Sequence, residues 1–231
     1  MNNNFLNTLL EDFEEKDLII NAVSFIKTFF NGESSGHDFY HSIRVFRTAH
    51  TIAKNEEKTQ KVNKKLVYLA ALLHDVDDIK LSPETYQNKD NAEKFLKLNG
   101  VSDEEILVIK KLIDDVSFRG KDSITPETIE GKIVQDADRL DAIGAIGIGR
   151  TFAFGGKKGR DMHDPEQQPK LNLSSEEYAK NNSTTINHFY EKLLKLKDLM
   201  NTESSKVIAL HRTKFMENFL NEFFDEWDGI K

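Results

Sequence analysis

Apolar residues recur at helical spacing along most of the chain, and only four prolines interrupt it. In the N-terminal segment, for example, one stripe contains Leu18, Ala22, Phe25 and Phe29. No segment of convincing length alternates between apolar and polar residues as a strand would, so the pattern predicts an all-α fold. The expected helices cover residues 4–30 (one or two helices), 38–57, 62–76, 92–98, 102–116, 126–154, 174–200 and 203–227.

Capping residues mark several of the expected helix ends. Asp38 is a plausible N-cap, Ser102 begins a capped start, and Pro126 suits the first position of a helix. Residues 155–173 show no apolar periodicity and are rich in Gly, Lys, Asp and Pro. We expect a long surface loop there, and loops of this length are usually functional or mobile.

The segment 62–76 is apolar on all sides, which predicts a buried helix. It leads directly into His74-Asp75-Val76-Asp77-Asp78. A carboxylate carried into a core costs several kcal/mol unless something compensates its charge, and a bound metal ion is one such compensator. This conflict between an apolar helix and its polar end is the sharpest functional signal in the sequence.

Composition narrows the chemistry that this signal can represent. The chain lacks cysteine, which excludes disulfides, thiolate nucleophiles and Cys-ligated zinc, so a metal must be held by His, Asp or Glu. The formal net charge of −7 is opposite to that of a typical duplex-binding protein, so no nucleic-acid partner is expected. With neither a long apolar run nor a secretory signal, we expect a cytoplasmic protein without membrane contact.

Two other helical segments also place a possible metal ligand on an apolar face. His41 opens the 38–57 segment ahead of Val45, and Asp138 follows the apolar approach of Ile133 and Val134. Taken singly, each has an ordinary explanation: a histidine near a helix start is usually a capping or surface residue, His74-Asp75 occurs by chance in many proteins, and Asp138 could pair with a neighbouring arginine. Together, the three interruptions favour a shared site.

The ordered set His41, His74-Asp75 and Asp138 resembles the H…HD…D signature of the HD-domain metal-dependent phosphohydrolases. His41-Ser42-Ile43-Arg44-Val45 matches the family's H-x-x-R-V segment, and Ala137-Asp138-Arg139-Leu140 matches its A-D-R-L segment. A closer resemblance, to the bacterial YpgQ-type subgroup, runs from about residue 18 to 227. It includes the segments 72–78, 135–145, 150–156 and 185–193.

This resemblance implies a single all-helical HD-type domain spanning residues 1–231. The metal-site helices would occupy about 37–142, followed by the 155–173 loop and the C-terminal helices at 174–227. It also implies one divalent ion held by His41, His74, Asp75 and Asp138, with Mn or Mg expected first and Fe, Co or Ni as alternatives. The subgroup is described as cleaving nucleoside triphosphates to monophosphate and pyrophosphate, whereas other HD proteins are nucleotidases, phosphodiesterases or alarmone hydrolases.

Asp78 matches the position where some HD nucleotidases carry a carboxylate that acts on the attacking water. We therefore assign Asp78 the role of general base or general acid, with Asp77 as the alternative. The expected substrate-binding residues are cations and polar groups near the ligands: Arg44, Lys80, Arg150 and His37. For the lysines and the arginine of residues 157–160, phosphate binding and simple solvation are equally good interpretations.

Two further interpretations of the chain stay open. The site could hold a nucleotide as a regulatory module without turnover, or the chain could be a helical scaffold that binds no metal. On the last helix, Phe215, Phe219, Phe223 and Trp227 recur at four-residue spacing. This stripe is either core or a contact surface, and it leaves a homodimer as an alternative to a monomer.

Overall fold

The computed structural model describes residues 8–11, 13–33, 38–79, 81–116, 124–171, 173–174, 176–177 and 181–231. All regular secondary structure among these residues is helical, which confirms the all-α prediction. The helices are α2 (Lys16–Phe29), α3 (Phe39–Glu56), α4 (Lys64–Leu73), α5 (Asp90–Leu98), α6 (Asp103–Val116), α7 (Ile129–Asp141), α8 (Gly144–Lys157), α10 (Thr185–Glu191), the 3₁₀ helix η2 (Leu193–Leu199) and α11 (Glu203–Trp227).

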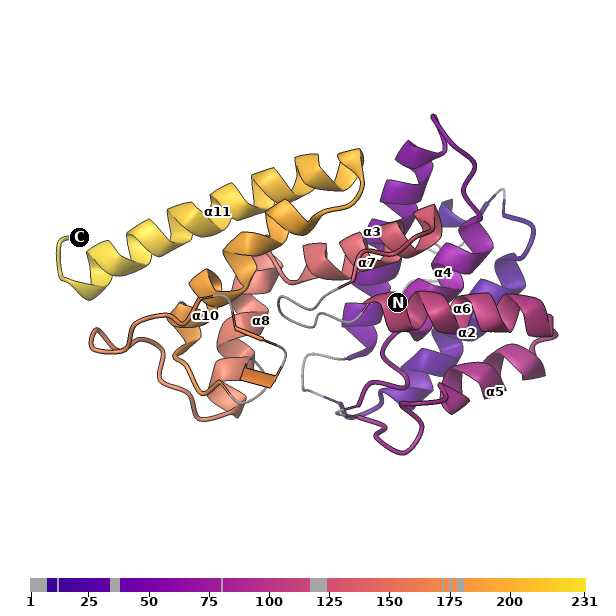
Figure 1. The fold of residues 1–231 in the computed structure, drawn as a ribbon, viewed down its shortest axis with the longest axis horizontal. Coiled ribbons are helices and arrows are strands. Elements are labelled where there is room, and N and C mark those ends of the chain that lie inside the picture. The colour runs from indigo at the N-terminus through magenta and orange to yellow at the C-terminus, as the bar shows by residue number, and fades with distance from the viewer. Residues whose placement is uncertain are drawn as a thin grey trace.

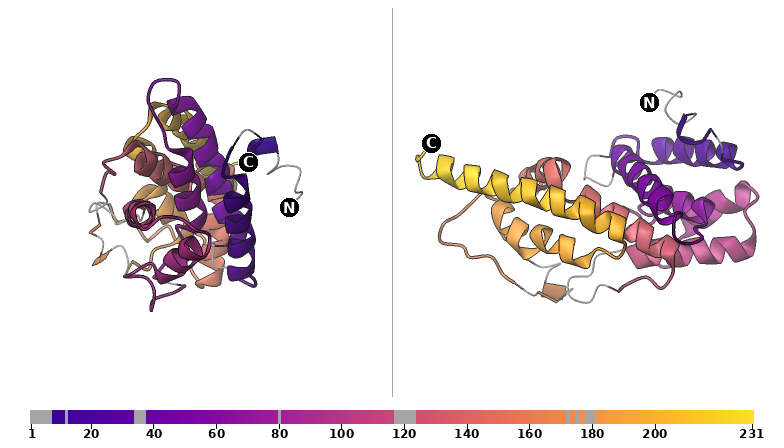
Figure 2. Two further views of the ribbon diagram at one scale, coloured as in Figure 1. Left: turned by 90° about the vertical axis from the view of Figure 1, so that its right-hand side faces the viewer. Right: turned by 90° about the horizontal axis from the view of Figure 1, so that it is seen from above.

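The helices form two groups joined through α7 (Figure 1). Helices α2 to α6 gather on one side, with α3 packed against both α4 and α7. Helices α8, α10 and η2 lie on the other side, covered by the long α11 (Figure 2). Among the described residues, no helix combines the length and apolar character that crossing a membrane requires.

Helix α4 lies at the centre of the first group. Every residue from Val67 to Leu73 is buried, as the unbroken apolar run predicts, and neighbours on several sides (α2, α3, α6 and α7) cover it. The helix ends at Leu73 rather than at Val76, and residues 74–77 form turns. His74 and Asp75 therefore lie just beyond the buried end of the helix.

The predicted helix over residues 126–154 is two helices. The first of them, α7, begins at Ile129 rather than at Pro126, and Thr128 caps it by accepting a hydrogen bond from the backbone N–H of Gly131. The break lies at Ala142 and Ile143, and α8 begins at Gly144, whose φ of +77° is a conformation that residues with a side chain rarely adopt. A Cβ at this position would also lie 3.0 Å from the Arg212 Cγ, so glycine permits a close approach of α11.

The predicted helix over residues 174–200 is also interrupted. Thr184 caps α10, which ends at Glu191, and η2 follows after Lys192. The non-helical stretch begins at Lys158, after α8, rather than at Gly155. This stretch is attached to α10: the Asn187 side chain donates to the Gln167 carbonyl (2.7 Å), and the Lys170 backbone N–H donates to the Glu191 carboxylate (3.0 Å).

Candidate metal centre

His41 reaches the interior from the first turn of α3. The Asp38 carboxylate accepts a hydrogen bond from the His41 backbone N–H (2.7 Å), which confirms Asp38 as the N-cap. His41 shares its helical face with Val45, Ala49 and Ile52, all buried. The spacing that places these apolar residues in the core therefore also buries the imidazole.

His74 and Asp75 enter the same space from the end of α4, and Asp138 enters it from α7. The Nε2 atoms of His41 and His74 lie 3.2 Å apart. The His41 Nε2 is also 3.3 Å from one oxygen of Asp75 and 3.3 Å from one oxygen of Asp138. The His74 Nε2 lies 3.4 Å from Asp75 and 3.8 Å from Asp138. The structure thus brings all four predicted ligands together.

The hydrogen bonds made by the Nδ1 atoms of the two imidazoles show that each Nε2 directs a lone pair at the cluster. The His41 Nδ1 donates to the Asp141 carboxylate (2.7 Å), and the His74 Nδ1 donates to the Ala71 carbonyl (2.9 Å). Both partners can only accept, so in the neutral rings each Nε2 carries a lone pair. Two lone pairs and two carboxylates converging on one point require a cation, so the donor set fits a divalent metal ion.

The burial of the four candidate ligands and the charges around His41 agree with a metal ion bound at this point. His41, His74 and Asp75 are buried, whereas the Asp138 side chain is 28% exposed and marks the accessible side of the cluster. Burial opposes a charge on His41, but the neighbouring Asp138, Asp141 and Asp75 carboxylates outweigh it and raise its pKa to about 9. Without a metal, the protein would therefore hold a proton where a cation fits.

Asp141 is a site residue to which the sequence analysis gave no role. Its carboxylate accepts from His41 and from the Arg44 guanidinium (Nε 2.7 Å, Nη2 3.0 Å), and Arg150 completes the set. Burial alone would raise the pKa of Asp141, but His41 and the two arginines hold it well below its usual range. Its position one helical turn after Asp138, on a buried helix, was the signal available in the sequence.

The structure gives Asp77 and Asp78 different surroundings. Asp77 is 1% exposed, and its two oxygens accept from the backbone N–H groups of Asn91 (3.1 Å) and Ala92 (2.9 Å) in the first turn of α5. That carboxylate caps a helix. Asp78 is partly exposed and follows Asp75 by one turn, with its backbone N–H bonded to the Asp75 carbonyl (3.1 Å). Of the two, Asp78 is therefore better placed to act on a water.

Comparison with known proteins agrees with this geometry. A family model, HD domain, matches residues 38–143. The protein YpgQ of Bacillus subtilis (strain 168) is 38% identical over 209 residues, which cover 90% of this chain and 92% of YpgQ. The chain belongs to the HD-domain superfamily. It is a hydrolase of that superfamily's metal-dependent phosphohydrolase family, as the sequence resemblance predicted.

Several solved structures align with most of this chain. A protein from Lactobacillus plantarum aligns with a TM-score of 0.80 at 36% identity, covering 92% of this chain and 97% of that one. An HD-superfamily hydrolase from Bacillus thuringiensis aligns with a TM-score of 0.72 at 39% identity, covering 93% and 98%. YpgQ in complex with ADP aligns with a TM-score of 0.69 at 35% identity, covering 90% and 100%.

The predicted substrate-binding residues of this HD-domain protein have mixed outcomes. Arg44 and Arg150 lie at the site, where both bind Asp141 while their side chains stay 30% and 25% exposed. His37 and Lys80 fall outside the described residues. In the loop after α8, Lys158 and Arg160 lie over the Phe154 ring (5.9 and 5.6 Å from its centroid), which favours a packing role for them.

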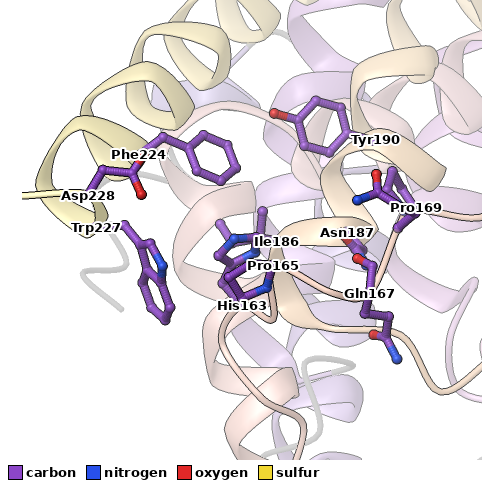
Figure 3. Close-up of a pocket in the computed structure, with 11 residues that line it drawn as sticks. His163, Pro165, Gln167, Pro169, Ile186, Asn187, Tyr190, Phe224, Trp227 and Asp228 are labelled. Carbon is purple, nitrogen blue, oxygen red and sulfur yellow. The ribbon is translucent and has the colours of Figure 1, made fainter.

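A separate cavity of about 420 Å³ lies at the C-terminal end of the HD-domain chain (Figure 3). Its walls come from the 163–169 segment, α10 and the end of α11, and include none of the four candidate ligands. His163 packs edge-on against Phe224 and Trp227 there. In the aromatic stripe of α11, Phe219 and Phe223 are partly buried and pack with Phe152, whereas Phe215 and Trp227 are about half exposed. The middle of the stripe therefore packs against the core.

Proposed function

We propose that this protein hydrolyses nucleoside triphosphates, ribo- or deoxyribonucleotides, to the monophosphate and pyrophosphate. The observation that carries the proposal is the convergence of His41, His74, Asp75 and Asp138 on one cation position, beside two partly exposed arginines. YpgQ, which shares more than a third of its residues with this chain, forms a complex with ADP. That complex supports a nucleotide as the substrate class.

His41, His74, Asp75 and Asp138 would hold the ion, with Asp138 on the side open to substrate. A bound divalent ion supplies an activated water and neutralises charge on the phosphoryl group. Mixed imidazole and carboxylate donors suit Mn²⁺, Fe²⁺ or Co²⁺, and Mg²⁺ is also compatible when water completes its coordination. We expect Mn²⁺ or Mg²⁺ first.

The remaining roles belong to the chain's own side chains. Asp78 would accept a proton from the attacking water. The water oxygen would form a bond to the α-phosphorus while the bond from that phosphorus to the oxygen bridging the α- and β-phosphates breaks, so that pyrophosphate leaves. Asp141 orients His41 through its Nδ1. Arg44 and Arg150, held by Asp141, would direct their exposed edges toward phosphate oxygens.

The test is product identification. The purified full chain, stripped of metal and reloaded with Mn²⁺ or Mg²⁺, is incubated with a panel of nucleoside mono-, di- and triphosphates, and the products are separated by chromatography. Monophosphate with pyrophosphate supports the proposal. Nucleoside with phosphate would show a nucleotidase, and tight nucleotide binding without any product would show a regulatory module. Asp75→Asn is the matched control, since it removes one ligand with almost no change of shape.

A further inference from the structure

The cavity at the C-terminal end of the chain has a wall that internal hydrogen bonds hold in place. Its volume of about 420 Å³ lies within the range of small-molecule sites, and the 163–169 segment forms one side of it (Figure 3). Gln167 fixes this segment to α10. Its side-chain oxygen accepts from the Thr184 backbone N–H (2.9 Å), and its carbonyl accepts from the Asn187 side chain (2.7 Å). The cavity is therefore formed by the chain itself, without a ligand to shape it.

Aromatic rings supply much of the cavity surface. Phe224 and Trp227 come from the last turns of α11, and Tyr190 comes from α10. His163 packs edge-on against Phe224 (5.2 Å between ring centroids) and against Trp227 (5.0 Å), so the imidazole keeps these two rings apart. Phe224 and Tyr190 are partly buried, whereas Trp227 is 46% exposed and lies at the open side. Such rings pack against an apolar body, and their faces also attract cations.

The polar groups of the cavity favour a donor that carries positive charge. Asn187 is 3% exposed, and its NH₂ group donates to Gln167, but its side-chain oxygen accepts no hydrogen bond from the residues that the structure describes. A buried acceptor without a donor is costly, so a ligand that brings an N–H group is favoured.

The charges around the cavity have one predominant sign. The Asp228 carboxylate lies at the end of α11, where the helix terminus adds partial negative charge. Of the described residues that line the cavity, none is a lysine or an arginine. A phosphate group would therefore find no cationic side chain of that kind to pair with, whereas an ammonium group would find a carboxylate.

We propose that this cavity binds an organic cation, an amine with a planar aromatic body. The body would pack against Tyr190, Phe224 and Trp227, an N–H group would donate to the Asn187 oxygen, and the positive charge would lie toward Asp228. The cavity contains none of the four candidate metal ligands. This second site is therefore separate from the metal centre, and it does not depend on the proposed reaction.

The test uses three probes that share an indole ring and differ in charge at pH 7: tryptamine (positive), tryptophol (neutral) and indole-3-acetate (negative). Their binding to the full chain is measured by titration calorimetry. Tryptamine should bind about 5- to 30-fold more tightly than tryptophol, the combined value of an exposed ion pair and a cation–π contact, and indole-3-acetate should bind most weakly. Equal affinities for the three probes, or no binding of tryptamine, would overturn the proposal.

Two substitutions locate the bound amine. Asp228→Asn, at an exposed side chain, should weaken tryptamine binding by about 2- to 5-fold and leave tryptophol binding unchanged, with the melting temperature of wild type. Trp227→Leu should weaken binding of both probes. The matched control Glu226→Gln, at the same end of α11 but outside the cavity lining, should change neither.

A further variant separates this cavity from the metal centre. Asp75→Asn removes a candidate metal ligand and should bind tryptamine as wild type does, whether or not the protein cleaves nucleotides. Loss of tryptamine binding in Asp75→Asn, or full tryptamine binding in both Asp228→Asn and Trp227→Leu, would show that the amine does not occupy this cavity.

Discussion

Asp141→Asn tests whether the hydrogen bond between the His41 Nδ1 and Asp141 keeps His41 in the tautomer that can bind a metal ion. The carboxylate accepts from the His41 Nδ1 (2.7 Å), a bond that keeps the Nε2 lone pair directed at the cluster. An asparagine amide can donate to Nδ1 instead, which would move the proton to Nε2 and block ligation. Losing such a partner typically costs about 10- to 100-fold in metal affinity, or about 1.4–2.7 kcal/mol.

The same substitution should also reduce folding stability. Removing one member of a buried ion pair costs about 3–5 kcal/mol, and we expect about 3 kcal/mol here because solvent reaches both Arg44 and Arg150. The pKa of Asp141 lies far below its usual range, so this stabilisation is complete at neutral pH. It is lost only as the pH falls below about 4, the value for an unfolded aspartate, and the gap between wild type and variant should narrow there.

Asp136→Asn is the matched control for this experiment. Asp136 lies on the same helix and is equally buried, but its oxygens bind Asn201 and Thr202 rather than any candidate ligand. We expect it to lower stability with no effect on metal affinity beyond that loss. Metal affinity is measured by calorimetry on the stripped proteins, and stability by urea unfolding. Metal binding by Asp141→Asn that matches wild type, or falls no further than in Asp136→Asn, would refute the reasoning.

Three further outcomes follow from the site and its surroundings. Asp78→Asn should reduce kcat by about 100- to 10,000-fold and leave folding stability unchanged. Asp77→Asn should lower the free energy of unfolding by about 1 kcal/mol, because it weakens the α5 cap, and should keep most of the activity. The opposite ranking in a turnover assay would exchange their roles. Burial lowers the pKa of His188 to about 3, so below about pH 6.5 the unfolded chain binds one more proton than the folded chain. The free energy of unfolding should therefore fall by up to about 1.4 kcal/mol for each unit by which the pH drops below about 6.5. His188→Gln should reduce this pH dependence in acid unfolding curves. Finally, metal binding near pH 7.5 should release about one proton, since the metal replaces the proton that His41 holds with a pKa of about 9; calorimetry in buffers of different ionisation enthalpy would show no buffer dependence if this is wrong.

The sequence by itself determined the elements whose causes are local. Helical periodicity predicted that His41 lies on the face of Val45 and Ala49, and the Asp38 cap followed from residue type alone. The unbroken apolar run before His74 likewise predicted its buried position. These features depend on neighbours within one or two turns, which a single sequence displays directly. The family resemblance then named the ligands that these helices carry.

Only the tertiary structure decided the partners that lie far apart in the chain. Asp141 binds His41, which lies 100 residues earlier in the chain. Asp77 differs from its neighbour Asp78 because Asp77 accepts hydrogen bonds from the first turn of α5. Gly144, where α8 begins, lies against the Arg212 side chain of α11, and the segment after η2 is fixed to α7 by the Asp136 carboxylate. The local sequence pattern does not predict such pairs, because the partner of each residue belongs to another helix that is distant in the sequence.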